Sequence, residues 1–283
     1  QLTPEQYAAE PAPGWSSVRF TVWHIAIVTD GWLKAVANDG TVREFAKVET
    51  FKPAIEWPDA AGEGGMAGLC LAPEQGYVFV TYTHRDKYGV LRNGLSRFTS
   101  TPRTFEGPAA DRRDYLELFE KDSSAFSHQI GACVVSGDSL YVSVGDGGDP
   151  AATRSLDKTL GKLLRLTLDG KPYPGNPFAS SGGTAAAVYA YGLRNPFGLQ
   201  IVDGRVFSAE NGIRIDRFLE IREGTDYGWD GTDASIATNA AAVFSPTICP
   251  VHVAYEPKDQ GPLRPSPHPR FPIAVFRKWR STR

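Results

Sequence analysis

His128 and Asp146 are the two side chains of this sequence best placed to move a proton. His128 lies in the segment SHQIG, and Asp146 closes the strand-like run LYVSVGD that follows it. A hairpin between the two segments would return the carboxylate to the imidazole. A carboxylate bonded to one ring nitrogen fixes the tautomer and leaves the other nitrogen as a proton acceptor. The spacing therefore predicts a general base, against the plainer alternative of a structural hydrogen bond.

A second candidate lies in YGLRNPFG, residues 191–198, where Arg194 and Asn195 directly precede a proline. The residue before a proline is held extended, so both polar head groups would project from one rigid corner. Arg194 offers a planar set of donors for a carboxylate or quinone oxygen, and Asn195 both donates and accepts. The alternative, that the two side chains cap neighbouring carbonyls, is equally consistent with the string.

The elements that must position these residues are predicted to be short strands. The 29 glycines and 21 prolines are spread along the chain and leave little room for long helices. Residues 77–83 form an aromatic and β-branched run, and residues 164–168 alternate leucine with polar side chains at period two. Both segments are expected to be half-buried strands. Residues 111–122 alone have a pattern compatible with a helix.

A repeat links three of the predicted strands. GYVFVTYT, DSLYVSVGD and DGRVFSAENG each follow a Gly or Asp turn, at intervals of 63 residues from Tyr77 to Leu140 and 65 from Leu140 to Arg205. Units of this length, built from short strands and loops, are typical of the four-stranded blades of a β-propeller. At this spacing 283 residues hold between four and five blades, with GWLKAVANDG from Gly31 as a looser copy.

Composition and charge exclude several classes of function. The 30 Lys and Arg against 32 Asp and Glu give a net charge of −2 with no basic stripe, which argues against nucleic-acid binding. No apolar run approaches the ~20 residues of a membrane-spanning helix. The chain begins at Gln1 rather than at a methionine, so we expect a processed, secreted or periplasmic protein.

The three cysteines are Cys70, Cys133 and Cys249. They lack the close pairs of a structural zinc site, and their odd number allows at most one internal disulfide. We expect three buried small hydrophobic residues in preference to a bridge.

The last 26 residues differ from the rest of the chain. Residues 258–283 contain seven Lys or Arg, one Asp and five prolines. Because proline interrupts strands, we expect a propeller over residues 1–257, followed by an irregular basic tail.

Eight strings occur in order over residues 62–231: GEGGMAGLCLAP, SHQIG, LYVSVGDGGD, LGKLLRLTLDG, GNPF, YAYGLRNPFGL, SAENG and DYGWDG. Together they resemble the soluble quinoprotein glucose and sorbosone dehydrogenase family, whose propeller is shared by hedgehog-interacting proteins. The resemblance implies an all-β, six-bladed propeller that binds pyrroloquinoline quinone (PQQ) and oxidises a sugar or related alcohol for an external electron acceptor. This chain is short for six blades, so a missing segment or a protein partner would complete the ring.

The resemblance also implies roles for the candidate residues. His128 matches the base that takes the proton of the sugar hydroxyl, and Asp146 matches the carboxylate that orients this base. Arg194 and Asn195 match a pair that contacts quinone and substrate.

Four further positions match cofactor and metal contacts of the family. Glu63 and Gln129 are expected at the quinone, and the carbonyls of Gly212 and Ile213 at a Ca²⁺ that bridges to it. Ile213 stands where the family has a proline, which is tolerable because only the carbonyl would bind the ion.

Arg217 is the main departure from the family pattern. The family has an acidic residue here, after Asp216, in a loop that usually supports a second calcium. A cation at this position would repel such an ion. The departure and the short chain favour an alternative function, a propeller that kept the scaffold as a binding module without catalysis. A metal-dependent lactone hydrolase, which needs acidic and Asn ligands at the channel mouth, is a third possibility.

Overall fold

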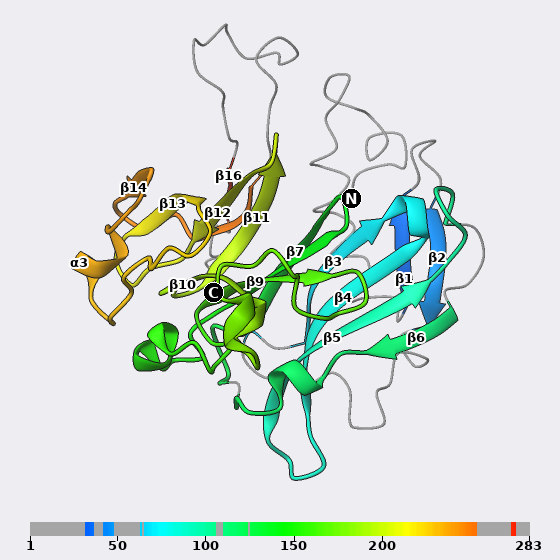
Figure 1. The fold of residues 1–283 in the computed structure, drawn as a ribbon. Coiled ribbons are helices and arrows are strands. Elements are labelled where there is room, and N and C mark those ends of the chain that lie inside the picture. The colour runs from blue at the N-terminus through cyan, green and yellow to red at the C-terminus, as the bar shows by residue number, and fades with distance from the viewer. Residues whose placement is uncertain are drawn as a thin grey trace, which may run out of the picture.

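The computed structural model describes residues 63, 65–105, 110–123 and 125–253, together with the backbone of residues 32–36, 42–47 and 273–275. These residues form three four-stranded and two two-stranded antiparallel sheets, with a few short helices (Figure 1). The all-β architecture expected from the sequence is confirmed.

Each four-stranded sheet is a meander of consecutive strands. The first consists of β3 (Met66–Ala72), β4 (Tyr77–Arg85), β5 (Leu91–Thr99) and β6 (Ala110–Asp114). The second consists of β7 (Ile130–Ser136), β8 (Ser139–Val144), β9 (Lys162–Thr167) and β10 (Val188–Tyr191). The third consists of β11 (Pro196–Val202), β12 (Arg205–Glu210), β13 (Asp216–Ile221) and β14 (Ala242–Phe244).

Two shorter sheets lie at the two ends of the described chain. One pairs β1 (Trp32–Val36), within the looser copy of the repeat, with β2 (Val42–Lys47). The other pairs β15 (Pro250–Val253) with β16 (Ile273–Val275). Because Ile273–Val275 form a ladder with β15, the expectation of an irregular tail is wrong for these three residues. The rest of the predicted tail lies outside the described residues.

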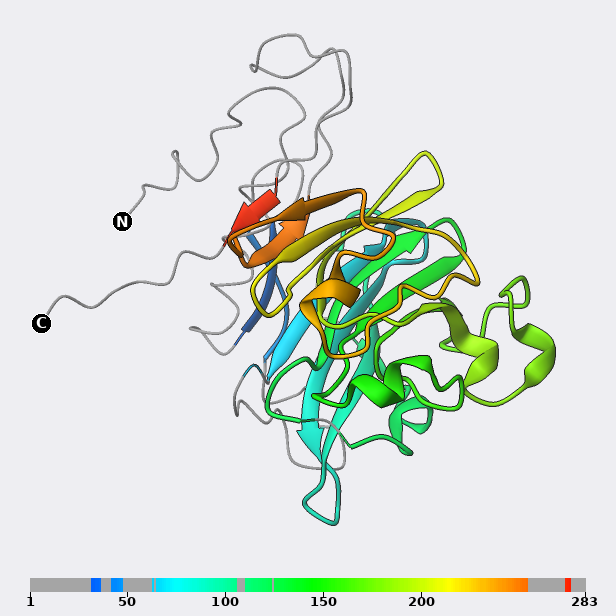
Figure 2. The same cartoon turned by 90° about the vertical axis from the view of Figure 1, so that its left-hand side faces the viewer.

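The repeat found in the sequence corresponds to the second strand of each complete sheet, namely β4, β8 and β12. The first strands of successive sheets pack on one another, β3 against β7, β7 against β11 and β11 against β15. The sheets spread outward from these strands like blades, as the two views show (Figures 1 and 2). This is the arrangement of a β-propeller.

The first strands approach closely because a glycine faces the neighbouring blade. A Cβ atom on Gly68 of β3 would lie 2.8 Å from the carbonyl oxygen of Gly131 in β7. The hydroxyl of Thr81 donates a 2.6 Å hydrogen bond to that same carbonyl. A side chain at Gly68 would therefore separate the two blades.

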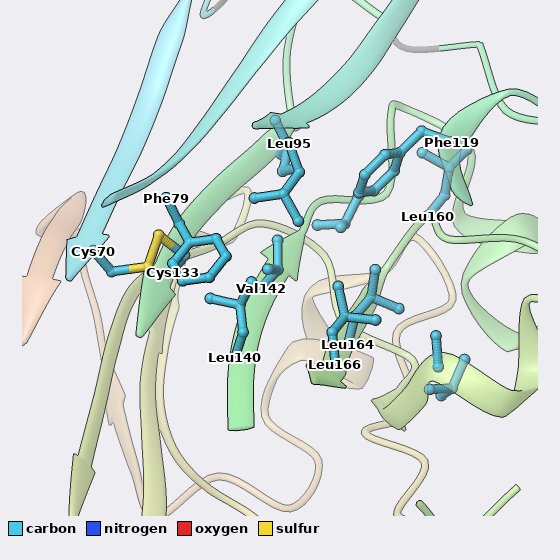
Figure 3. Close-up of a cluster of buried hydrophobic side chains, with 14 of the residues drawn as sticks. Cys70, Phe79, Leu95, Phe119, Cys133, Leu140, Val142, Leu160, Leu164 and Leu166 are labelled. Atoms are coloured by element: carbon cyan, nitrogen blue, oxygen red, sulfur yellow. A yellow bond between two sulfur atoms is a disulfide. The ribbon is translucent and has the colours of Figure 1, made fainter. Parts of the chain in front are cut away.

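Neighbouring blades bury both faces of the sheets between them. In the second blade, Leu140 and Val142 pack with Phe79 and Leu95 of the first blade (Figure 3). Tyr141, on the opposite face of β8, packs in a cluster shared with the third blade. Residues 78–83 of β4 are likewise all buried. The segment 77–83 is thus a strand as predicted, but it is not half-buried, because a blade has no solvent-facing side here.

A disulfide joins Cys70 of β3 to Cys133 of β7, with 5.7 Å between the Cα atoms (Figure 3). The expectation of three buried thiols is wrong. The two cysteines face one another because they occupy adjacent first strands, and Cys249 is exposed and unpaired.

The helices of the described chain are all short: η2 (Pro73–Gln75), η3 (Glu117–Phe119), η4 (Pro150–Arg154), η5 (Ala179–Ser181), η6 (Ala185–Ala187) and α3 (Asp233–Ile236). None of these is long and apolar enough to cross a membrane. The helix considered for residues 111–122 is wrong, because the first residues of this segment belong to β6 and pair with β5, and only η3 follows.

Candidate active site

His128 and Asp146 are in direct contact, as expected from the hairpin that the sequence predicted. The Nδ1 atom of His128 lies 2.6 Å from Oδ1 of Asp146. Asp146 follows β8, and His128 precedes β7, so the antiparallel β7–β8 ladder places the two side by side. The imidazole is 16% exposed and the carboxylate 2%, so the ring lies between a buried anion and the surface.

The backbone around His128 has an unusual conformation that depends on Gly145. His128 has a φ of 56°, in the left-handed region that side chains rarely adopt. A Cβ atom on Gly145 would lie 2.4 Å from the carbonyl oxygen of His128. The glycine before Asp146 thus lets the two segments approach closely enough for the imidazole–carboxylate bond.

Asp146 accepts three hydrogen bonds within the described structure. Besides His128, its Oδ1 accepts the N–H of Gly148 at 2.9 Å, and its Oδ2 accepts the indole N–H of Trp229 at 2.7 Å. Burial alone would raise the pKa of Asp146, but these hydrogen bonds outweigh it and lower the pKa below its ordinary value of 3.8. The carboxylate is therefore ionised at neutral pH and oriented on both sides.

Arg194 and Asn195 are the last two residues of the loop between β10 and β11. Nη1 of Arg194 donates to the carbonyl of Asn211 at 2.6 Å, so the capping alternative holds for one of its nitrogens. The guanidinium carbon lies 5.5 Å from the ring centre of Trp229. Nε of Arg194 is buried without a hydrogen-bond partner among the described residues. Asn195 is buried as well.

The two candidates are parts of one site. The N–H of Asp146 donates to the carbonyl of Arg194 at 2.6 Å. Trp229 contacts both, by its indole hydrogen bond to Asp146 and by its ring face toward Arg194. Sequence reasoning assigned no role to Trp229, although its string DYGWDG was one of the eight that carried the resemblance.

Glu63 and Gln129 both lie beside His128, Glu63 by a hydrogen bond and Gln129 as the next residue in the chain. Oε2 of Glu63 accepts the backbone N–H of His128 at 2.8 Å. Gln129 donates from Nε2 to the carbonyl of Ala125, while its Oε1 is buried without a partner among the described residues. Both positions predicted at the cofactor thus belong to the His128 side of the site.

Gly212 and Ile213 lie next to Arg194, one and two residues beyond the carbonyl that it binds. The N–H of Gly212 donates to Oδ1 of Asp216 at 2.8 Å, and Ile213 is 54% exposed. Within the described chain no hydrogen bond ends on either carbonyl. No group of three or more His, Cys, Asp or Glu side chains that could hold a metal ion occurs among the described residues.

The resemblance implied that Arg217 lies in a loop, but the structure places it in a strand. It is the second residue of β13, and its guanidinium is paired with the carboxylate of Glu210. Asp216 beside it accepts backbone N–H groups with both oxygens, from Gly212 and from Ile248 and Cys249. The neighbourhood expected for a second calcium is therefore a set of internal hydrogen bonds and one buried cation.

The site combines an oriented imidazole, a guanidinium and unpaired polar atoms at one end of the blades. Asp146 holds the Nδ1 side of the ring, which leaves Nε2 to accept a proton. The guanidinium of Arg194 lies over the ring of Trp229, whose indole N–H binds the same carboxylate as His128. Such an arrangement can remove a hydroxyl proton next to a bound anion or electron acceptor.

Comparison with known proteins identifies the family. The family model for glucose/sorbosone dehydrogenase matches residues 20–246. The aldose sugar dehydrogenase YliI of Escherichia coli (strain K12) is 28% identical over 186 residues, which are 60% of this chain and 47% of that protein. Quinoprotein glucose dehydrogenase B of Acinetobacter calcoaceticus is 26% identical over 234 residues, 70% of this chain and 47% of that protein.

A solved structure agrees with these relatives. The PQQ-bound aldose sugar dehydrogenase of Streptomyces coelicolor superposes with a TM-score of 0.61 at 27% identity, covering 80% of this chain and 66% of that one. The chain spans about half the length of the curated relatives it matches. Since the family model covers most of the sequence and the solved relative has the same fold, the chain belongs to the glucose/sorbosone dehydrogenase family.

Proposed function

We propose that this chain forms the catalytic part of a PQQ-dependent sugar dehydrogenase, in which His128 is the base. The observation that carries the proposal is the double contact of Asp146. Its buried carboxylate accepts from His128, and its backbone N–H donates to the carbonyl of Arg194. The substrate would be an aldose or a related alcohol, and the electrons would pass to an external acceptor.

The polar atoms left without partners suit a quinone and a sugar together, because they offer a donor for the carbonyl or carboxylate oxygens of a quinone and acceptors for the hydroxyl groups of a sugar. Nε of Arg194 is a donor, and Oε1 of Gln129 and Oδ1 of Asn211 are acceptors; all three are buried and unpaired within the described structure. A buried polar atom without a partner costs about 1–3 kcal/mol, so such atoms mark places where a polar ligand would bind. Glu63 and Asn195 would complete the contacts.

His128 would act on the substrate hydroxyl through Nε2. Asp146 keeps the ring proton on Nδ1 and stabilises the imidazolium that forms when Nε2 takes the hydroxyl proton. The carbon that carries the hydroxyl loses a hydride in the same step and becomes a carbonyl, so that two electrons and one proton leave it. PQQ, when bound, supplies the acceptor for this hydride.

Arg194, together with a Ca²⁺ held by the Gly212–Ile213 segment, would provide the positive charge that the transfer requires. The guanidinium is fixed by the Asn211 carbonyl and the face of Trp229, which pre-organises its charge. The free carbonyls of Gly212 and Ile213 are ligands of the kind that Ca²⁺ prefers, and we propose them for an ion that PQQ helps to bind.

We further propose an extracytoplasmic location. The Cys70–Cys133 disulfide supports it, because disulfides persist in oxidising compartments and are rare in the cytosol.

Two measurements test the proposal. Tryptophan fluorescence monitors binding while PQQ is titrated into the protein in the presence of Ca²⁺, and dye reduction with a panel of aldoses then measures turnover. Saturable binding with aldose-dependent reduction is the expected result. Absence of both would leave the binding-module alternative, and opening of lactones without PQQ would favour the hydrolase.

A further inference from the structure

A buried ion pair lies directly behind the Arg194–Asn195 corner. Glu210 ends β12, and Arg217 stands opposite it in the β12–β13 ladder. Both side chains are 0% exposed, and the Nε–H of Arg217 donates to Oε2 of Glu210. Because a charge pair removed from water is costly unless its other polar atoms are also bonded, the remaining partners show what the pair holds in place.

The free oxygen of Glu210 binds the backbone of the corner. Its Oε1 accepts the N–H of Arg194 and, at 3.1 Å, the N–H of Asn195. Two consecutive peptide groups are thus fixed by one carboxylate oxygen. The direction in which both side chains leave the corner depends on this contact.

The other two nitrogens of the Arg217 guanidinium face backbone carbonyls of three separate segments. Nη1 donates to the carbonyls of Tyr227 and Thr238, each at 2.9 Å, and Nη2 lies 3.5 Å from the carbonyl of Gly192. Gly192 precedes the corner by two residues, so Arg217 holds the same loop that Glu210 holds.

The contact with Gly192 also reaches the Asp146 side of the site. The Gly192 carbonyl accepts the backbone N–H of Trp229 at 3.0 Å, and the indole of Trp229 donates to Asp146. The ion pair therefore lies behind both halves of the candidate site.

Charge gives the pair a second effect. An unpaired carboxylate at Glu210, directly behind the N–H groups of the corner, would repel an anionic ligand. Arg217 neutralises that charge while leaving Oε1 free to accept.

We propose that Glu210 and Arg217 are positioning residues that set the Arg194–Asn195 corner for an anionic quinone; this proposal rests on the function proposed above. Neither residue is expected to touch substrate or cofactor. Their effect passes through the backbone of the corner and through the charge that Arg217 cancels.

The test compares Arg217→Met with Arg205→Met as a matched control. Arg205 pairs with Glu220 across the same two strands, but at their exposed far end, with N–O distances of 2.9 and 2.8 Å. We expect Arg217→Met to weaken PQQ binding roughly tenfold or more, since it removes charge-assisted hydrogen bonds behind the site. Arg205→Met should bind PQQ like the wild-type protein.

The double variant Glu210→Gln/Arg217→Met separates the charge effect from simple damage. The glutamine side chain keeps an oxygen for the two N–H groups and carries no charge, so PQQ binding should recover in part relative to Arg217→Met. No recovery would overturn the electrostatic part of the proposal. If Arg217→Met does not fold, Arg217→Lys replaces it, and it should bind PQQ more weakly than wild type because one ammonium cannot reach Glu210 and all three carbonyls.

Amide hydrogen exchange provides a readout that needs no cofactor. Exchange at Arg194 and Asn195 should be faster in Arg217→Met than in Arg205→Met. Unchanged exchange at these two amides in a folded Arg217→Met protein would overturn the positioning role. If exchange accelerates while the wild-type protein binds no PQQ, the proposed function fails and the positioning role stands.

Discussion

Replacing Asp146 by Asn tests the central contact of the site, because it changes charge and hydrogen bonding with almost no change in size. The wild-type carboxylate accepts from His128, Gly148 and Trp229. An amide has one acceptor oxygen, so its NH₂ group must face at least one of these donors. If the NH₂ group faces Trp229, one hydrogen bond to a charged group is lost, worth about 1.5–3 kcal/mol. If it faces His128, Nδ1 must become the acceptor.

The arrangement in which the NH₂ group faces His128 would impair catalysis. A proton moved from Nδ1 to Nε2 blocks the nitrogen that should accept the substrate proton. We therefore expect Asp146→Asn to lower kcat by roughly 10²–10⁴, the usual contribution of a positioned base. PQQ binding should change little, since Asp146 contacts the base rather than the cofactor.

Steady-state dye reduction with the quinone-loaded protein measures this effect, and Asp149→Asn is the control. Asp149 lies in the same loop, but it only caps η4 by accepting from the N–H groups of Ala151 and Ala152, a role that asparagine also fills. Equal turnover of Asp146→Asn and Asp149→Asn would refute the assignment of Asp146 as the residue that orients the base.

The same variant has a defined pH dependence. The pKa of Asp146 is lower in the folded protein than its ordinary value of 3.8, so the unfolded state binds more protons as pH falls through this region. The wild-type protein should therefore be more stable than Asp146→Asn at neutral pH. This advantage should shrink as pH falls below about 4 and through the lower folded pKa. A difference in unfolding free energy that does not vary with pH would contradict it.

Three further predictions concern stability and the placement of the base. Reduction or double substitution of Cys70 and Cys133, which are 63 residues apart, should lower the unfolding free energy in denaturant by about 4 kcal/mol, and an unchanged midpoint would contradict this. Burial lowers the pKa of Lys162 from 10.5 to about 7, so the unfolding free energy should rise with pH between these values, and Lys162→Met should flatten that rise. Gly145→Ala should reduce both Tm and turnover, since its Cβ would lie 2.4 Å from the His128 carbonyl oxygen; full activity would show that His128 is held differently.

Local patterns in the sequence predicted the strands and the contact at the base correctly. The repeat identified β4, β8 and β12, because each blade repeats the same turn and buried strand. His128 and Asp146 belong to one hairpin, so their proximity follows from local pairing alone. The burial of residues 78–83 on both faces could not be predicted from the strand itself, since it depends on the stacking of blades.

Contacts between distant segments were the ones that sequence reasoning missed. The indole of Trp229 reaches Asp146 across 83 residues, and the pairing of Arg217 with Glu210 depends on the register of β12 and β13. Arg217 looked like an obstacle to a metal because its partner was not evident. The disulfide could have been found, since the 63 residues between its cysteines equal the Tyr77–Leu140 interval and place both at one position of the repeat.

The most direct test of whether His128 is the base beside a bound quinone is a comparison of aldose turnover between the quinone-loaded wild-type protein and His128→Ala. We predict that His128→Ala retains PQQ binding within a few-fold and loses turnover by roughly 10²–10⁴. Turnover equal to that of the wild-type protein would contradict the role of His128.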